Sequence, residues 1–151
     1  MRKSYSDYRD LCEYYQEACV KFNRADYKGA IENIFDAIEF WSDNAEYYDL
    51  RGLCKMRLGH YEKAIEDFTK ALYFEEWNAS AYNNRGTAKA KLGRYEEALQ
   101  DFVLADKFWR DYLKEYYPMD GIWEGFMLVD EKGLFAVHNS DEVNKLRKDS
   151  A

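Results

Sequence analysis

Few side chains in this sequence have the types and spacing that catalysis or metal binding requires. Glu62 and Glu66 are four residues apart, which on a helix places two carboxylates side by side as a candidate acid and base pair. The same pair is more simply a solvated helix face. His60 and His138 are the only histidines, and neither lies in a nucleophile motif, a glycine-rich phosphate loop or a metal-ligand spacing. We therefore expect no enzymatic activity, no catalytic residue, no bound metal and no cofactor.

Composition and charge limit the classes of partner. The 151 residues carry a net charge of −7, which argues against a basic face for nucleic acid and against binding to an anionic membrane. No apolar run approaches the length of about eighteen residues that a transmembrane helix needs, and the start, MRKSYSDYRDLCEYY, lacks the apolar core of a secretory signal. The three cysteines, Cys12, Cys19 and Cys54, do not make an even disulfide set. We predict reduced thiols and a cytoplasmic location, with no nucleic-acid or membrane partner.

The chain repeats itself with a period of thirty-four residues. Residues 45–78 and 79–112 are identical in fourteen of thirty-four aligned columns, and a weaker copy precedes them at residues 11–44. A period of this length is typical of stacked supersecondary units that each bury too little apolar surface to fold alone. Three copies are enough for the stack to form a continuous core.

Each copy has the pattern of two helices joined by a tight turn. In the second copy we expect helices over roughly residues 46–58 and 61–74, because apolar residues in the latter recur at three-four spacing. Asn44 stands where an N-cap belongs, and Gly59 supplies the positive φ that often follows a helix end. Their counterparts one period later have the same roles. Small residues within both helices predict that the two backbones approach closely.

The repeated pattern resembles that of the tetratricopeptide repeat (TPR) family. In the second copy the family's columns match Tyr48, Gly52, Tyr61, Ala64, Phe68 and Ala71, and the third copy matches them again. The resemblance implies an all-α fold, a right-handed α-solenoid of three helix-turn-helix repeats. The implied domains are the start of the first helix at 1–10, repeats at 11–44, 45–78 and 79–112, and a non-repeat C-terminal capping segment at 113–151.

Several residues depart from the family's pattern. Arg51 and its later counterpart replace a leucine before the first glycine, a feature shared with some bacterial-like repeats. In the first copy, Ala18 and Ala25 replace the two glycines and Ile34 replaces the phenylalanine. The family's proline near the end of each unit is absent, so capping must set the turns between units.

The resemblance also implies a concave groove lined by the first helix of each unit. The groove positions that we expect to bind a peptide or protein segment are Tyr15, Cys19, Phe22, Asp49, Leu50, Leu53, Met56, Arg57, Asn83, Asn84, Thr87 and Lys91. The remaining inward positions hold Cys12, Gln16, Asn23, Glu46, Ser80 and Ala90. Asparagine amides can bond a peptide backbone, and the apolar floor can take its side chains. Alternatively, the aromatic and aliphatic groove residues pack against a neighbouring element.

One TPR subclass grips the C-terminal carboxylate of chaperone tails with Lys, Arg and Asn side chains. The corresponding positions here hold Tyr15, Cys19, Leu50, Ser80 and Asn84. None of these is a cation, and such sites rely on charge-assisted hydrogen bonds. We therefore predict a non-enzymatic protein-protein interaction module outside the carboxylate-clamp subclass. The alternative is a self-associating structural subunit.

The tail, residues 113–151, does not follow the repeat. Its first residues continue the last helix of the third copy until Pro118 stops it. Phe126–Val129 and Leu134–Val137 flank a four-residue turn and predict either a β-hairpin or a helix. The apolar residues of this tail must cover something. It either caps the last repeat, blocks the groove, or exchanges with a second chain in a homodimer.

Overall fold

The protein is a succession of helix pairs. The computed structural model describes the backbone of residues 5–116, 128–129 and 135–136, and the side chains of residues 13–116. Within these residues the helices are α1 (Tyr5–Asn23), α2 (Tyr27–Phe40), α3 (Ala45–Arg57), α4 (Tyr61–Phe74), α5 (Ala79–Lys91) and α6 (Tyr95–Tyr116). The predicted all-α fold class is confirmed, and the observed bounds of α3 and α4 lie within one residue of those expected.

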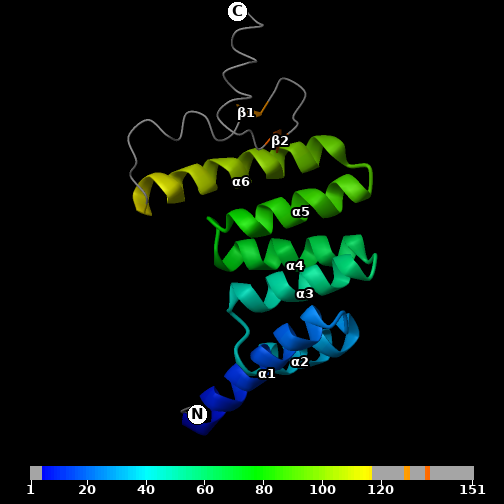
Figure 1. Ribbon diagram of the computed structural model, residues 1–151, viewed down its shortest axis with the longest axis vertical. Coiled ribbons are helices and arrows are strands. Elements are labelled where there is room, and N and C mark those ends of the chain that lie inside the picture. The colour runs from blue at the N-terminus through cyan, green and yellow to red at the C-terminus, as the bar shows by residue number, and fades with distance from the viewer. Residues whose placement is uncertain (1–4, 117–127, 130–134, 137–151) are drawn as a thin grey trace, which may run out of the picture. The chain divides into compact units, whose positions relative to one another are not determined.

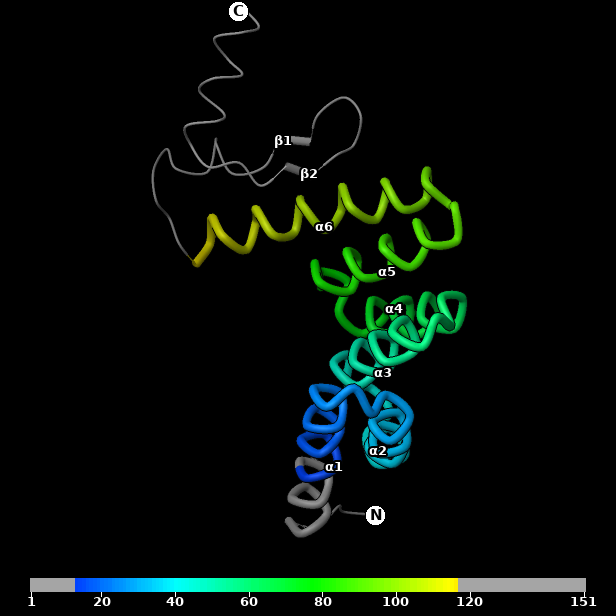
Figure 2. Tube along the Cα trace, turned by 45° about the vertical axis from the view of Figure 1, so that its right-hand side comes forward, coloured from blue at the N-terminus to red at the C-terminus, as the bar shows by residue number. Residues whose placement is uncertain are grey.

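Two compact units make up the chain, Met1–Ala105 and Asp106–Ala151, and α6 runs through the boundary between them. In the first unit, each of the helices α1 to α4 packs against the next in chain order, and α3 also contacts α1 and α5 (Figure 1). A view turned by 45° shows the same succession of α1 to α5 (Figure 2). The first helices of successive pairs are therefore neighbours, which is the arrangement that a shared groove requires.

The core of the first unit is continuous across the copies. One cluster joins Ala18, Ile34 and Ala37 of the first copy to Tyr47 and Cys54 of the second. Two further clusters join the second copy to the third. In one, Tyr48, Ala71 and Leu72 of the second copy pack with Ala81 of the third. In the other, Ala64 and Phe68 of the second copy pack with Ala88 of the third. Ala64, Phe68, Ala71, Ala81 and Ala88 are each 0% exposed. Each copy therefore hides its apolar face against the adjoining one.

Two glycines allow the helices of a pair to approach closely. A Cβ atom at Gly52 would lie 2.7 Å from Cε1 of Phe68, and one at Gly86 would lie 2.8 Å from Cε1 of Phe102. Neither position can hold a larger residue unless the aromatic ring moves. In the first copy the corresponding residues are Ala18 and Ile34, which share one buried cluster. A larger residue on the first helix is thus matched by a smaller one on the second.

The turn within each copy has one hydrogen-bond pattern. After α3, the N–H of Gly59 donates to the carbonyl of Met56 (3.0 Å) and the N–H of His60 donates to the carbonyl of Lys55 (2.9 Å). This is a Schellman motif, which needs a positive φ at its central residue. Gly59 has φ +80°, as the sequence analysis predicted, and its counterpart in the third copy has φ +78°. Ala25 takes the same position in the first copy with φ +61°, although it carries a Cβ.

Side-chain caps fix the starts of the helices. Oδ1 of Asn44 accepts from the N–H of Glu46 (2.9 Å), and Oδ1 of Asn78 accepts from the N–H of Ala81 (2.9 Å), so both predicted N-caps are confirmed. Asp26 caps α2 in the same way. His60 precedes α4 without a side-chain cap.

The unusual arginine before each glycine binds a buried carboxylate on the second helix of its own copy. The Arg51 guanidinium donates two hydrogen bonds to Asp67, of 3.0 and 2.7 Å, and Nζ of Lys55 lies 2.6 Å from the same carboxylate. The third copy repeats this arrangement, with Asp101 accepting from Arg85 (2.9 and 2.7 Å) and lying 2.8 Å from Lys89. In the first copy the acceptor at this position is neutral, because Lys21 donates to the amide oxygen of Asn33 (2.9 Å).

In the second unit, residues 106–116 continue α6, so the tail begins with helix as predicted. Two short strands, β1 (Leu128–Val129) and β2 (Phe135–Ala136), pair antiparallel, with Leu128 opposite Ala136 and Val129 opposite Phe135. They lie where the hairpin interpretation places strands. Pro118 and the remaining apolar residues of the tail lie outside the described residues, as does any cap or blocked groove that they would form. Within the described part of the chain, no helix combines the length and apolarity that a membrane span needs.

A candidate peptide-binding groove

A pocket of about 340 Å³ opens on the side of the first unit where α1, α3 and α5 meet. We call it the groove pocket. Its lining residues are Tyr15, Glu46, Asp49, Leu50, Leu53, Glu75, Asn78 and Ser80. Four of these, Tyr15, Asp49, Leu50 and Leu53, are among the groove residues expected from the sequence.

The spacing on α3 explains why one helix supplies half of the lining. Glu46, Asp49, Leu50 and Leu53 recur at three-four spacing, so their side chains share one face of the helix. Leu50 is also part of the first buried cluster, and Tyr15 packs beside that cluster. The core thus holds the apolar floor of the pocket in place.

Two residues of the groove pocket were not predicted for it. Glu75 and Asn78 belong to the turn between α4 and α5, and the sequence analysis gave Asn78 a capping role only. The cap is real, and Nδ2 of Asn78 also donates to Oε2 of Glu75 (3.3 Å). The signal that could have found them is their position, because the turn that leads into α5 delivers the chain to the groove side of the stack.

Several other predicted groove residues lie against the core. Cys19 and Phe22 pack beside the first buried cluster, and Met56 packs beside the cluster that contains Phe68. The guanidinium carbon of Arg57 lies 6.0 Å from the centre of the Phe22 ring. Cys19, Phe22, Met56 and Arg57 do not line the groove pocket.

On α5 the predicted residues form a polar strip. Nδ2 of Asn84 donates to Oδ1 of Asp49 (3.4 Å) and to Oγ of Ser80 (3.5 Å), which links α5 to α3. Thr87 donates to the backbone carbonyl of Asn83 (2.9 Å), and the Asn83 side chain is exposed. Lys91 is exposed at the end of α5.

The groove pocket is acidic, because Glu46, Asp49 and Glu75 are among its lining residues. Burial raises the pKa of the Asp49 carboxyl above its ordinary value, and Glu75 and Glu46 raise it further, while the hydrogen bond from Asn84 lowers it. Burial likewise raises the pKa of the Tyr15 hydroxyl, and the neighbouring Cys19 and Glu46 add to this effect. The pocket therefore disfavours additional negative charge.

The arrangement is suited to holding a polar or cationic group. Among the described residues, no three His, Cys, Asp or Glu side chains are placed to hold a metal ion together.

Cys19 and Cys54 are free thiols, and burial raises the pKa of Cys54 to about 11, which keeps this thiol protonated and unreactive at neutral pH.

Comparisons with known proteins identify the repeat. Two tetratricopeptide repeat models match the chain, one over residues 45–76 and the other over residues 79–107. The TPR domain of Arabidopsis OM64 is 30% identical, with 65% of this chain and 81% of that one covered and a TM-score of 0.63. No curated protein sequence matches the chain.

Two further solved structures share the fold. The second TPR domain of human RPAP3, in complex with the HSP70 peptide SGPTIEEVD, is 27% identical, with 67% of this chain and 84% of that one covered and a TM-score of 0.64. The MamA crystal structure is 26% identical, with 69% of this chain and 61% of that one covered and a TM-score of 0.66. The chain belongs to the tetratricopeptide repeat family, and this class of fold is a protein-interaction module.

Proposed function

We propose that this protein binds an extended segment of another protein on the face shared by α1, α3 and α5. The observation that carries the proposal is the groove pocket, since its lining combines a core-supported apolar floor with polar groups from two further elements. Binding sites typically combine apolar walls with a small number of placed polar groups.

The polar strip beside the pocket suits a peptide backbone. The exposed Asn83 amide offers both a donor and an acceptor, so it can bond the N–H and C=O groups of an extended chain. Asn84 is held by Asp49 and Ser80, which keeps its side chain pre-positioned on the same face. Because the Asn84 side chain is already in place, its contribution to binding loses little conformational entropy.

The relatives support a peptide partner while this chain's own residues change its expected chemistry. The RPAP3 domain is described with a bound peptide that ends in EEVD. The positions that a carboxylate clamp would use here hold Tyr15, Cys19, Leu50, Ser80 and Asn84. We propose a peptide-binding site without a clamp for a terminal carboxylate, because no cation stands at these positions.

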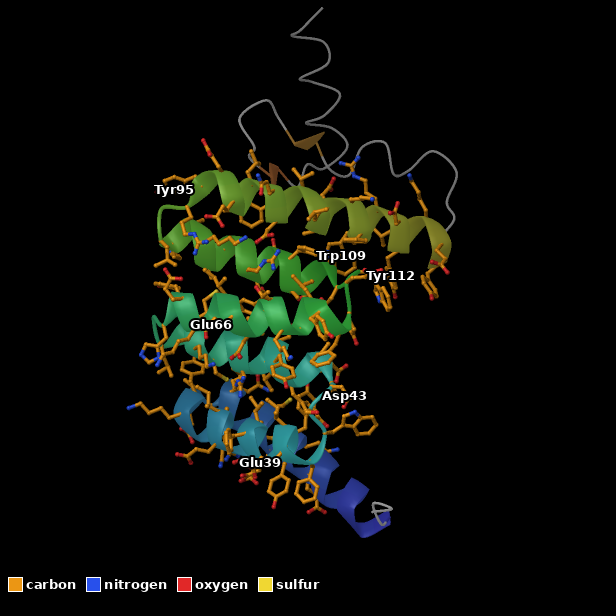
Figure 3. All side chains as sticks on the ribbon, turned by 180° about the vertical axis from the view of Figure 1, so that it is seen from behind. Glu39, Asp43, Glu66, Tyr95, Trp109 and Tyr112 are labelled. Carbon is orange, nitrogen blue, oxygen red and sulfur yellow. The ribbon has the colours of Figure 1, made fainter. Side chains whose placement is uncertain are left out.

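A variant that fills the pocket tests the proposal. Ser80 is an exposed residue in the first turn of α5, so Ser80→Trp places a large ring in the groove pocket without entering the core. Glu66→Trp is the matched control, because Glu66 is exposed on α4 and lies outside the pocket lining (Figure 3). Both variants should keep the wild-type melting temperature.

The assay is selection from a phage-displayed library of random linear peptides. We expect wild type and Glu66→Trp to enrich common sequences that Ser80→Trp does not bind. If the wild type enriches no peptide beyond those enriched by Ser80→Trp, the proposed function is wrong.

A further inference from the structure

We propose that the segment bound in the groove is basic, and that Lys or Arg side chains of this segment enter the groove pocket and a second pocket that adjoins it. This inference rests on the proposed function and names the chemical class of its ligand.

The second pocket adjoins the first at the turns between copies. It has a volume of about 300 Å³, and we call it the turn pocket. Its lining residues are Trp41, Asp43, Asn44, Ala45, Glu46, Phe74 and Glu75. Glu46 and Glu75 line both pockets, so two carboxylates lie on their common border.

The carboxylates of the two pockets contrast with those inside the helix pairs. Asp67 and Asp101, which are buried, each have an Arg and a Lys nitrogen 2.6 to 2.8 Å from a carboxylate oxygen. In the part of the chain that the structure describes, the ion pairs do not include Asp43, Glu46, Asp49 or Glu75. The protein thus pairs Asp67 and Asp101 with cations, whereas the pocket carboxylates Asp49 and Glu75 have amide partners in place of cations.

Those amide partners hold the carboxylates without neutralising them. Asp49 accepts a hydrogen bond from Asn84 (3.4 Å), and Glu75 accepts one from Asn78 (3.3 Å). Burial and neighbouring negative charge raise the pKa of Asp49. A cation in the groove pocket would relieve this repulsion and gain charge-assisted hydrogen bonds.

The apolar parts of both pockets suit the rest of a basic side chain. Trp41 and Phe74 line the turn pocket and Tyr15 lines the groove pocket, so the methylene stem of a Lys or Arg can lie along an aromatic surface. A cation above an aromatic face is attracted by the ring. Phe74 already takes part in one such contact, with Nζ of Lys70 5.1 Å from its ring centre.

The shape of the site favours a peptide over a free ion. Each pocket is large enough for a side chain, and no described acidic cluster is arranged to coordinate a metal. Two pockets joined along α3 can receive two side chains of one extended segment. Charge complementarity therefore commits the groove to a segment with at least two basic residues, which is opposite in sign to an EEVD tail.

A pocket-neutralised variant, Asp49→Asn with Glu75→Gln, tests the inference. Its matched control is Glu39→Gln with Glu66→Gln, which removes the same charge from exposed positions on α2 and α4 (Figure 3). The ligands are synthetic copies of the peptides enriched by the wild type, and affinity is measured by fluorescence anisotropy. A second set of the same peptides has every Lys and Arg replaced by Gln.

We expect the enriched peptides to be rich in Lys and Arg, to bind the pocket-neutralised variant at least tenfold more weakly, and to bind the control variant within twofold of wild type. Their Gln copies should bind at least tenfold more weakly to wild type. Peptides that are neutral or acidic, or that bind the pocket-neutralised variant as tightly as wild type, would overturn the inference while sensitivity to Ser80→Trp keeps the proposed function. If Ser80→Trp enriches the same peptides as wild type, both proposals fall together.

Discussion

The contact between Gly52 and Phe68 predicts that Gly52→Ala destabilises the wild-type protein but stabilises a variant with a smaller residue at position 68. In Gly52→Ala the new Cβ would lie 2.7 Å from the Phe68 ring, about 0.8 Å less than the roughly 3.5 Å at which two carbon atoms pack favourably. The ring is fully buried and cannot move into solvent. Overpacking of this kind costs about 1–3 kcal/mol, and the better helix propensity of Ala returns about 1 kcal/mol. We expect Gly52→Ala to destabilise the protein by about 1 kcal/mol.

Phe68→Ile should reverse that effect. Alone it removes part of a buried ring and costs about 2 kcal/mol, less than the loss expected for Phe→Ala. It also vacates the space that the new methyl group at position 52 would occupy, so adding Gly52→Ala to Phe68→Ile should stabilise by about 1 kcal/mol through helix propensity. The double variant reproduces the pair found in the first copy, Ala18 with Ile34.

The assay is urea unfolding of the wild type, both single variants and the double variant, followed by helical circular dichroism. The expected coupling energy is about 2 kcal/mol. Phe102→Ile is the matched background, because Phe102 contacts Gly86 in the third copy and not Gly52. Gly52→Ala should stay destabilising there. If Gly52→Ala changes stability equally in the Phe68→Ile and Phe102→Ile backgrounds, the steric explanation of the close approach is wrong.

Three further predictions concern single positions. Ala25→Gly should stabilise by about 0.5–1 kcal/mol, because it removes the cost of a positive φ in a residue with a Cβ, and a higher urea midpoint would show this. His60→Asp should stabilise the protein by about 1 kcal/mol, because Asp at position 60 can cap α4 as Asp26 caps α2 and the two capping residues have nearly the same φ and ψ. An unchanged urea midpoint would contradict this. Asp49 has a raised pKa in the folded state, so its charge opposes folding above that pKa and the penalty disappears as the carboxyl is protonated. Asp49→Asn should therefore raise the urea midpoint at pH 7 and leave it unchanged below about pH 4, near the ordinary pKa of Asp.

The turns and caps could be predicted from the sequence because their chemistry is local. Asn44 starts α3 and Gly59 ends it through hydrogen bonds between residues that are at most five apart in the sequence. The repeat period then extends the same prediction to the third copy. A helical face recognised at three-four spacing was enough to place the core, since Ala64 and Phe68 are fully buried as the pattern requires.

The internal ion pairs could not be derived in the same way. Arg51 and Asp67 are sixteen residues apart on different helices, and only the packing of the pair brings them together. The sequence carried a signal, because Arg85 and Asp101 recur in the same two columns, but a repeated pair of charges is also common on solvated faces. In the sequence of the first copy, Ala18 and Ile34 are two separate departures from the family's pattern, although in the folded chain they pack in one buried cluster and compensate each other.

The groove was predicted as one set of positions on the first helices of the repeats. In the structure some of these residues line the groove pocket and others pack beside the core. Leu50 and Leu53 line the groove pocket and also contact the buried clusters of the core. Phe22 and Met56 pack beside those clusters and do not line the pocket. Periodicity identifies a helix face and not how deeply each residue on it is covered. Glu75 was missed because a turn has no periodicity from which its direction could be inferred.

In the second copy, Arg51 and Lys55 both bind Asp67 of that copy, so a duplicated segment would carry this set of ion pairs with it. Tandem duplication of residues 45–78 should therefore raise the urea midpoint, because the inserted copy adds one more buried interface. The first copy lacks this set, since Glu17 and Asn33 stand in the columns of Arg51 and Asp67 and Lys21 donates to the neutral Asn33. Growth of such a chain over evolutionary time is expected from its middle, with the opening copy retained once.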